Sequence, residues 1–275
     1  MIKKLSKLGI AAAALAGLAA NAQAGGVDAA YAPAPTWSGV YAGLNAGVAW
    51  TEFDNTLRIE DGVRPFFSSG APSWIPAVNN AGRLSDDTTD ITGGAQIGVN
   101  MQTGNWVMGV EGDFNYLDSE RNRSVSAEYP GSTSSYRIET SAGLDWLMTL
   151  RGRLGYATNG LLLYGTAGLA VADIEFSQSF NEPGFTTAPL DIDSSKTKAG
   201  VAVGGGVEWM LYERRGLSFK GEYLYAAFDD ASFSGSTAGP LTPGVGTFGA
   251  RFNDSVDVDL HVVRVGINKQ LGGVE

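Results

Sequence analysis

The chain has no cysteine among its 275 residues and only one histidine. Without cysteine, it can form no disulfide framework, zinc knuckle, iron–sulfur cluster or thiol nucleophile. Basic side chains are also scarce, because 19 Lys and Arg stand against 29 Asp and Glu and the sequence pI is about 4.6. Proteins that bind nucleic acids neutralise phosphates with basic residues, so we expect no nucleic-acid partner.

Apolar runs long enough to span a bilayer are missing as well. The first 24 residues carry Lys3, Lys4 and Lys7, then an apolar stretch over 8–20, then Ala22-Gln23-Ala24. This order is typical of a secretory signal peptide cleaved after Ala24, and its apolar stretch is too short for a membrane anchor. Cleavage leaves 16 basic against 29 acidic side chains, a net charge of −13. The sequence therefore predicts export.

Glycine is abundant, with 38 residues or about twice the usual share, and it falls within segments that alternate every second residue. Such alternation indicates β-strands with two different faces. Eight segments are expected as strands: 40–50, 91–101, 106–116, 144–151, 161–172, 201–211, 217–225 and 256–271. The segment 161–172 is apolar on both faces, so its inward positions stay open.

The connections alternate in length. Three are short and of turn composition, at 103–105, 157–160 and 212–216, whereas those after the first, third, fifth and seventh segments exceed twenty residues. This pattern predicts an all-β fold, an eight-stranded antiparallel transmembrane barrel with three short periplasmic turns and four long extracellular loops. A soluble β-sandwich is the alternative, but it has no reason to keep all long loops at one end.

The barrel is expected over 37–271, between a periplasmic tail at 25–36 and a short tail at 272–275. An eight-stranded barrel has room inside only for its own side chains, so the glycine-rich polar face should point inward. We expect ion pairs there, including Glu208 with Lys220 and Glu222 with Arg264, which close the lumen. The predicted lumen residues are Glu111, Asp113, Asp145, Arg151, Arg153, Lys198, Glu208, Lys220, Glu222 and Arg264.

Aromatic residues at the strand ends predict two interfacial girdles. The predicted members are Trp37, Trp50, Trp106, Tyr116, Trp146, Tyr156, Trp209, Tyr212 and Tyr225. In the last strand the apolar positions change from even to odd near Val262. This change predicts either a β-bulge or a strand whose upper part rises clear of the bilayer.

Four stretches carry a family resemblance: 37–47 (WSGVYAGLNAG), 163–170 (LYGTAGLA), 220–225 (KGEYLY) and 263–268 (VRVGIN). Together they make the chain, over roughly 36–271, similar to the outer-membrane immunogenic proteins, small alphaproteobacterial barrels resembling the transmembrane domain of OmpA. The resemblance implies an abundant, surface-exposed, antigenic envelope protein without catalytic residues. Such barrels usually end on an aromatic residue, whereas this last strand ends near Leu271.

Chemistry at the barrel surface has few candidates. Some small barrels hydrolyse or acylate lipid A and need a hydroxyl activated by a histidine, but His261 is the only histidine and is expected at the rim near Tyr225 and Gly47. Asp191-Ile-Asp193 begins like a calcium loop but lacks its glycine and closing glutamate. We interpret the acidic clusters as solvated loop charge, with cation sharing with lipopolysaccharide as the alternative.

The sequence thus predicts a non-enzymatic outer-membrane barrel with structural and surface-interaction roles and no cofactor. A small-solute channel is the alternative, and a lipid A-modifying enzyme is a distant third. Expected partners are outer-membrane lipid and lipopolysaccharide, the barrel-assembly machinery and host surface ligands bound by the loops, and we expect a monomer. Because the ten lumen charges balance, the net negative charge should lie on the extracellular face and disfavour anionic polymers such as heparin.

Overall fold

The computed structural model describes residues 36–61, 74–182, 190–211, 216–240 and 247–272. The strands are β1 (Gly39–Asp61), β2 (Ser85–Thr103), β3 (Trp106–Glu128), β4 (Ser135–Thr158), β5 (Leu161–Asn181), β6 (Leu190–Met210), β7 (Leu217–Phe228), β8 (Ala231–Pro240) and β9 (Thr247–Gly272). The helix of the described residues is α2 (Trp74–Ala81), which is not long enough or apolar enough to cross a membrane. The predicted signal peptide, its predicted cleavage site Ala24, residues 25–35 of the predicted tail and residues 273–275 lie outside the described residues.

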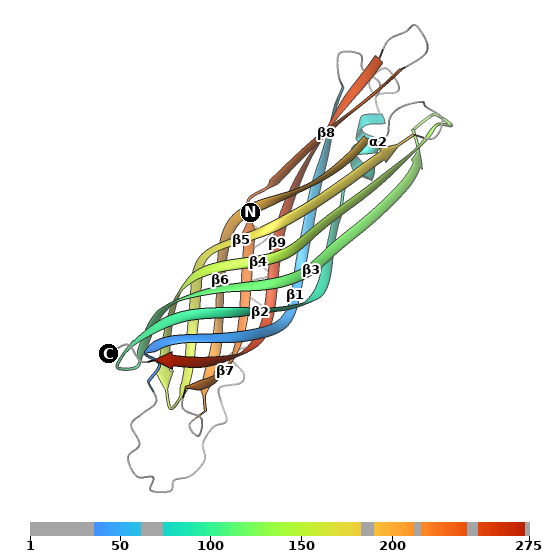
Figure 1. The fold of residues 1–275 in the computed structure, drawn as a ribbon. Helices are drawn as coiled ribbons and strands as arrows, with labels where there is room; N and C mark the ends of the chain where they lie inside the picture. Colours follow the sequence, from blue (N-terminus) through green and yellow to red (C-terminus); the bar gives the residue numbers. More distant parts are fainter. Residues whose placement is uncertain (1–35, 62–73, 183–189, 212–215, 241–246, 273–275) are drawn as a thin grey trace, which may run out of the picture.

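The strands form one antiparallel sheet that closes into a barrel (Figure 1). Eight strands, β1 to β7 and β9, follow one another around the ring, and pairing of β1 with β9 closes it. The ninth strand, β8, continues the line of β7 and pairs with the far half of β9. The prediction of eight strands therefore describes the ring but omits β8.

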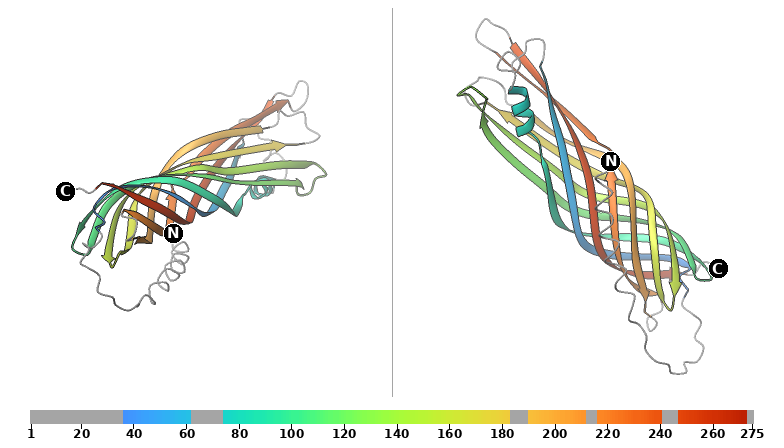
Figure 2. Two further views of the ribbon diagram at one scale, coloured as in Figure 1. Left: turned by 60° about the horizontal axis from the view of Figure 1, so that its bottom comes forward. Right: turned by 180° about the vertical axis from the view of Figure 1, so that it is seen from behind.

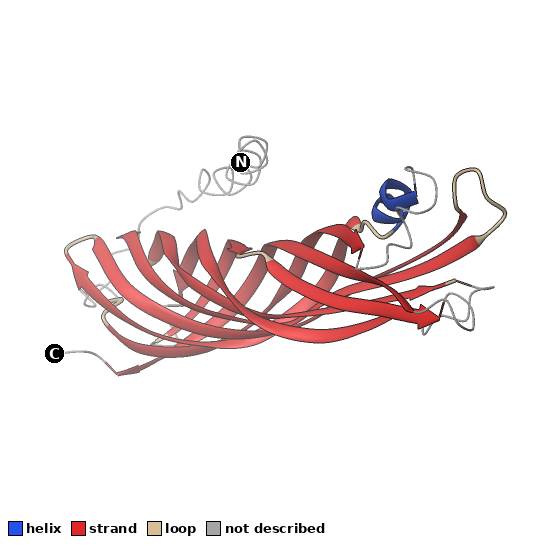
Figure 3. Ribbon diagram, turned by 90° about the horizontal axis from the view of Figure 1, so that it is seen from above, coloured by secondary structure: helices blue, strands red, loops and turns tan. Residues whose placement is uncertain are grey.

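Most strands are about twice as long as the sequence indicates, although β7, with 12 residues, extends only slightly beyond the predicted 217–225. β1 and β3 each have 23 residues and β9 has 26. The connection between β3 and β4 shrinks to 129–134, and that between β5 and β6 to 182–189. The prediction of four long loops is therefore wrong in part, because Ser, Thr and acidic residues that look like loop composition form exposed faces of strands. Figure 3 shows these strands running the length of the molecule, with α2 at one end.

The lower half of the barrel, next to the short turns, has an apolar exterior. Large side chains such as Leu44, Val265 and Leu163 are 62–69% exposed there. Inward positions carry polar residues or glycine, and in β5 they are the even residues, as the buried Leu162 and Tyr164 show. A Cβ on the inward Gly47 would lie 2.2 Å from the Val263 carbonyl oxygen, so only glycine allows β1 and β9 this approach.

The upper half has the opposite polarity. In β1 the inward Phe53, Leu57 and Ile59 are buried, while Asp54 and Arg58 point outward and are exposed. The same facing positions thus carry polar residues inside the lower half and apolar residues inside the upper half. An apolar exterior suits lipid and an apolar interior suits water, so the inversion marks the point where the strands leave the membrane.

The upper half is built from two sheets of four strands, β2-β1-β9-β8 and β3-β4-β5-β6. Pairing between β2 and β3 ends at Gly93 and Tyr116, and pairing between β6 and β7 ends at Gly200 and Phe228. Beyond these levels the described residues show no strand pairing across either boundary, apart from one backbone hydrogen bond from Asp229 N–H to the Ala199 carbonyl oxygen at 3.3 Å, and Figure 2 shows the strands spreading apart. The soluble β-sandwich was the alternative that the sequence disfavoured for the whole chain. The upper half nevertheless has the two facing sheets of a β-sandwich.

Aromatic contacts join the two sheets across their apolar interior. The Phe180 ring on β5 lies 5.2 Å from Phe252 on β9, and Phe176 on β5 stacks at 5.0 Å on Phe233 of β8. These side chains are at most 4% exposed. The upper half thus has the packed core of a water-soluble sandwich.

Basic side chains close the two boundaries between the sheets. Arg121 Nε on β3 donates to the Asp87 carbonyl oxygen of β2 at 2.9 Å, and Arg123 Nη1 donates to that of Arg83 at 2.6 Å. On the other side, Lys198 Nζ on β6 donates to the Asp230 carbonyl oxygen at 2.7 Å. Asp87 belongs to β2, whereas Arg83 and Asp230 lie just before β2 and β8. These side chains therefore satisfy carbonyl groups along and next to the strand edges and hinder pairing with another chain.

An irregularity separates the halves on one side of the barrel. The pairing register shifts between Tyr116 and Ser119 of β3 and between Leu144 and Leu147 of β4. The extra residue in β4 reverses its facing, so Leu144, predicted to face outward, is fully buried. In β9, by contrast, the register with β1 is unbroken around Val262. The bulge predicted there is absent, and the alternative, a strand that rises clear of the bilayer, describes β9.

Candidate functional site

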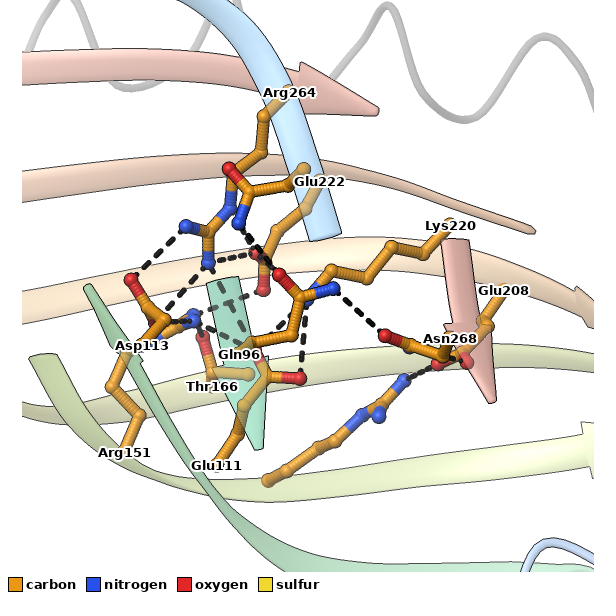
Figure 4. A network of polar contacts seen from close by, with 12 residues as sticks. Gln96, Glu111, Asp113, Arg151, Thr166, Glu208, Lys220, Glu222, Arg264 and Asn268 are labelled. Atoms are coloured by element: carbon orange, nitrogen blue, oxygen red, sulfur yellow. Dashed lines mark hydrogen bonds and ion pairs between the residues drawn. The ribbon is translucent and has the colours of Figure 1, made fainter. Parts of the chain in front are cut away.

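The lumen of the lower half holds a central cluster of three acidic and three basic side chains (Figure 4). Arg151 on β4 contacts acids on β3 and β7. Its Nη2 lies 2.9 Å from Glu111 Oε1 and 2.7 Å from Asp113 Oδ2, both on β3. Its Nη1 lies 2.9 Å from Glu222 Oε1 on β7. Arg264 Nη2 lies 2.6 Å from Glu222 Oε2. Lys220 Nζ lies 3.0 Å from Glu111 Oε1. The six side chains are at most 2% exposed, and their charges cancel.

A second pair lies nearer the short turns. Arg153 Nη2 contacts Glu208 Oε2, and its guanidinium stacks 3.7 Å from the centre of the Tyr164 ring. The Tyr41 hydroxyl links both groups, because it donates to Glu111 Oε2 at 2.8 Å and accepts from Arg153 Nη1 at 3.2 Å. The ion pairs therefore form one connected network.

Uncharged side chains complete the network, and the sequence analysis did not select them. Asn45 donates to Gln96 at 2.6 Å, Gln96 to Asn268 at 2.7 Å, and Asn268 to Glu208 at 2.8 Å. Thr149 donates to Asp113 at 2.6 Å. Their inward parity was the signal that could have found them, because buried charge needs all its hydrogen bonds satisfied.

Eight of the ten predicted lumen residues meet in this network, but Asp145 and Lys198 do not. Asp145 lies in the β4 irregularity, half-buried above the network, where the reversal of facing takes it out of the lumen. Lys198 lies above the level at which β6 loses β7 as a partner, so its side chain reaches out through the boundary to Asp230.

The predicted pairs are placed as follows. Glu222 and Arg264 face each other on β7 and β9 and form an ion pair. Glu208 and Lys220 also face each other on β6 and β7, but each pairs elsewhere, Glu208 with Arg153 and Lys220 with Glu111. Long side chains in a narrow lumen reach across it, so register alone does not decide their partners.

The predicted girdle residues fall into three groups. Trp50, Trp106, Tyr116, Tyr156 and Trp209 are 38–60% exposed on the outer face. Trp146 and Tyr225 are half-buried, and Tyr212 lies outside the described residues. The prediction that Trp37 belongs to the girdle is wrong. Its side chain is 5% exposed and packs at the bottom of the lumen with Val107, Ala157, Leu162, Tyr164 and Met210. It precedes β1 and turns inward, where it covers the apolar floor.

His261 lies on the outer face near the upper edge of the apolar band. It is paired with Tyr225 on β7, as expected, and with Trp50 instead of Gly47 on β1. Its Nδ1 lies 2.7 Å from the Tyr223 hydroxyl. Among the residues that the structure covers, no three acidic or histidine side chains are arranged to hold a metal ion.

Comparisons with known proteins find outer-membrane proteins. A family model described as an outer membrane protein β-barrel domain matches residues 10–240. The 31 kDa outer-membrane immunogenic protein of Brucella melitensis is 33% identical over 192 residues, 69% of this chain and 70% of the relative. The 22 kDa outer membrane protein of Rhizobium leguminosarum is 31% identical, over 61% and 65%. The outer membrane protein OprG from Pseudomonas aeruginosa is 15% identical, with a TM-score of 0.42, over 85% and 97%.

Proposed function

Because the chain belongs to the outer-membrane β-barrel family and is placed in the cell outer membrane, we propose that it serves there as a structural and surface-interaction protein. The lower half anchors it in lipid, and the upper half projects beyond the membrane as a folded surface. Outer-membrane lipid and lipopolysaccharide surround it, the barrel-assembly machinery inserts it, and ligands at the surface contact the upper half. We propose that it acts as a monomer.

The observation that carries this proposal is the closed lumen. Glu111, Arg151, Glu222 and Arg264 extend from four strands and meet with hardly any exposed area. An eight-stranded ring is only wide enough for such side chains, so water and solutes have no continuous path. A small-solute channel, the alternative function, would need these ion pairs to separate.

Two observations support a non-enzymatic role. The Tyr223 hydroxyl occupies hydrogen-bonding distance at His261 Nδ1, and the ring packs 5.0 Å from Tyr225. The hydroxyl at His261 Nδ1 is thus a phenol on the same outer face, and the Tyr225 hydroxyl donates to Asp259 Oδ1. Lipid A hydrolysis would need a serine or similar hydroxyl beside the base and an acid behind it.

Planar-bilayer recordings test the proposal. The mature protein should give no large, stable open state. The matched variant Arg151→Ala, which removes the side chain that bridges three acids, should produce leak currents because the remaining acids repel one another. Large, stable conductance from the unaltered protein would overturn the closed lumen and favour the transport function.

A further inference from the structure

A small polar cluster is buried within the apolar interior of the upper half. Asp254 on β9, Asn55 on β1, Gln178 on β5 and Thr140 on β4 are at most 3% exposed. Asn55 Nδ2 donates to Asp254 Oδ1 at 2.9 Å, and Gln178 Nε2 lies 3.4 Å from the same oxygen and 3.3 Å from Thr140 Oγ1. The cluster therefore connects the two sheets of the sandwich.

Acceptors exceed donors in this cluster. Asp254 Oδ2 and Gln178 Oε1 are buried and make no hydrogen bond. The contacts of the Asp254 carboxyl from β1 and β5 are uncharged amides, and its strand-pair neighbours Leu57 and Phe233 are apolar. A protonated carboxyl donates one hydrogen bond, whereas a carboxylate here would be a buried charge without a cation. The geometry thus favours the neutral acid.

The cluster holds the C-terminal end of the helical segment. Asn55, the partner of Asp254, donates its backbone N–H to the Leu84 carbonyl oxygen at 2.8 Å, and its side-chain Oδ1 accepts from Leu84 N–H at 2.7 Å. Gly82 approaches Leu57 so closely that an added Cβ would lie 2.5 Å from Leu57 Cδ2. The segment that follows α2 is therefore seated on the Asn55–Asp254 pair.

The N-terminal end of α2 rests on a second buried acid. The Trp74 ring stacks 4.4 Å from Tyr129, and the Tyr129 hydroxyl donates to Glu182 Oε1. Glu182 is 3% exposed. Among the described residues, Tyr136 also packs at this end, with its ring 4.8 Å from Tyr129. Between the two ends, Val78 of α2 is fully buried in the interior of the sandwich.

We propose that α2 is a proton-dependent cover of the sandwich interior, docked while Asp254 and Glu182 are neutral and released as they ionise. Burial supports this, because it raises the pKa of Asp254 to about 7 against the weaker opposing effect of the Gln178 hydrogen bond. Burial also raises the pKa of Glu182. This inference concerns the upper half alone and is independent of the closed lumen.

The sign of the pH dependence follows from proton binding. A raised pKa means that the docked state binds a proton that the undocked state has lost. Between the ordinary pKa of an aspartate, 3.8, and the docked value of about 7, the Asp254 proton makes docking about tenfold weaker per pH unit. Docking is strongest below this window and reaches its lower plateau above pH 7. Glu182 adds to the slope in the same direction.

Site-specific labelling measures the docking, because the chain has no native cysteine. Val78→Cys places a thiol on the buried face of α2, and Ser234→Cys places one on the exposed face of β8 as a control for the reactivity of the thiol itself. The full mature protein in lipid vesicles is labelled with a dipyridyl disulfide from pH 4 to pH 8. The ratio of the two rates should rise steeply to pH 7 and then level off.

Matched variants assign the effect. Asp254→Asn cannot ionise and should remove one proton from the slope, and adding Glu182→Gln should make the ratio independent of pH. Asp191→Asn, which removes an exposed acid, should leave the slope unchanged. A rate ratio that does not change with pH in the parent Val78→Cys protein would overturn the proposal, whether or not the other variants fold. An unchanged slope in Asp254→Asn would do the same.

Discussion

Replacing Lys220 by methionine tests whether the lumen is held by reciprocal charge. Methionine keeps the length and apolar stem of the side chain but removes its ammonium group. The central cluster then has three acids and two bases, with one uncompensated negative charge among side chains that are at most 2% exposed. The variant should therefore be strongly destabilised.

The magnitude follows from the distances. Lys220 Nζ lies 3.0 Å from Glu111 and 3.7 Å from Glu222. With an effective dielectric constant of about 20, these separations correspond to attractions of about 5 kcal/mol each, before desolvation is subtracted. Removing one partner of a buried pair costs about 3–5 kcal/mol, mainly because the other charge is left without compensation. We expect a decrease of that size in the free energy of unfolding.

Two double variants identify the partner. Lys220→Met with Glu111→Gln restores the balance of charge, and the new amide oxygen can still accept the Tyr41 hydroxyl, so most of the loss should be recovered. Lys220→Met with Glu208→Gln also deprives Arg153 of its acid and should be at least as unstable as the single variant. Urea unfolding of the barrel in lipid vesicles, followed by tryptophan fluorescence, gives the four free energies. Equal rescue by both doubles would refute the pairing, and a harmless Lys220→Met would refute the argument from buried charge.

Three further outcomes are expected. Gly47→Ala should block barrel closure, whereas Gly221→Ala, whose Cβ would meet nothing within 4 Å, should fold normally, as the heat-dependent migration of folded barrels on gels will show. Phe252→Ala should destabilise the sandwich by about 3–5 kcal/mol and expose it to added protease while the lower half stays intact; resistance equal to the parent would contradict the packed core. The folded protein should pass through a heparin column at low salt because its net charge is negative, and salt-sensitive retention would contradict this.

Local alternation was enough to predict the ring and its lower half. Segments such as 106–116 carry an apolar and a polar face at strict period two, and an eight-stranded ring leaves one choice for which faces inward. Inward charges such as Glu111 and Arg151 could therefore be identified before any coordinates. The partners of the inward charges could not be predicted. Glu208, for example, pairs with Arg153 and not with Lys220, which faces it in the register, because the choice depends on how far each side chain extends across the lumen.

The upper half was missed for a different reason. Its strands have polar outer faces, as Thr56, Arg58 and Glu60 illustrate, and their composition resembles that of loops. In β9 the even-numbered residues point inward along the strand. The apolar residues are the outward, odd-numbered ones where the strand crosses lipid and the inward, even-numbered ones where it is surrounded by water. A reader of the sequence sees this reversal near Val262 as a slip in register, although the backbone continues without one.

The two-sheet upper half changes what an antibody can recognise on this protein. Its surface consists of side chains from neighbouring strands, so an epitope such as one around Thr56, Ser255 and Ser232 combines residues far apart in the chain. A linear peptide from any one strand presents alternate residues to the wrong side and lacks the adjoining strands. Sera raised against the folded barrel should therefore lose most of their reactivity once the protein is heated in detergent, and fragments of the protein would need both sheets to preserve it.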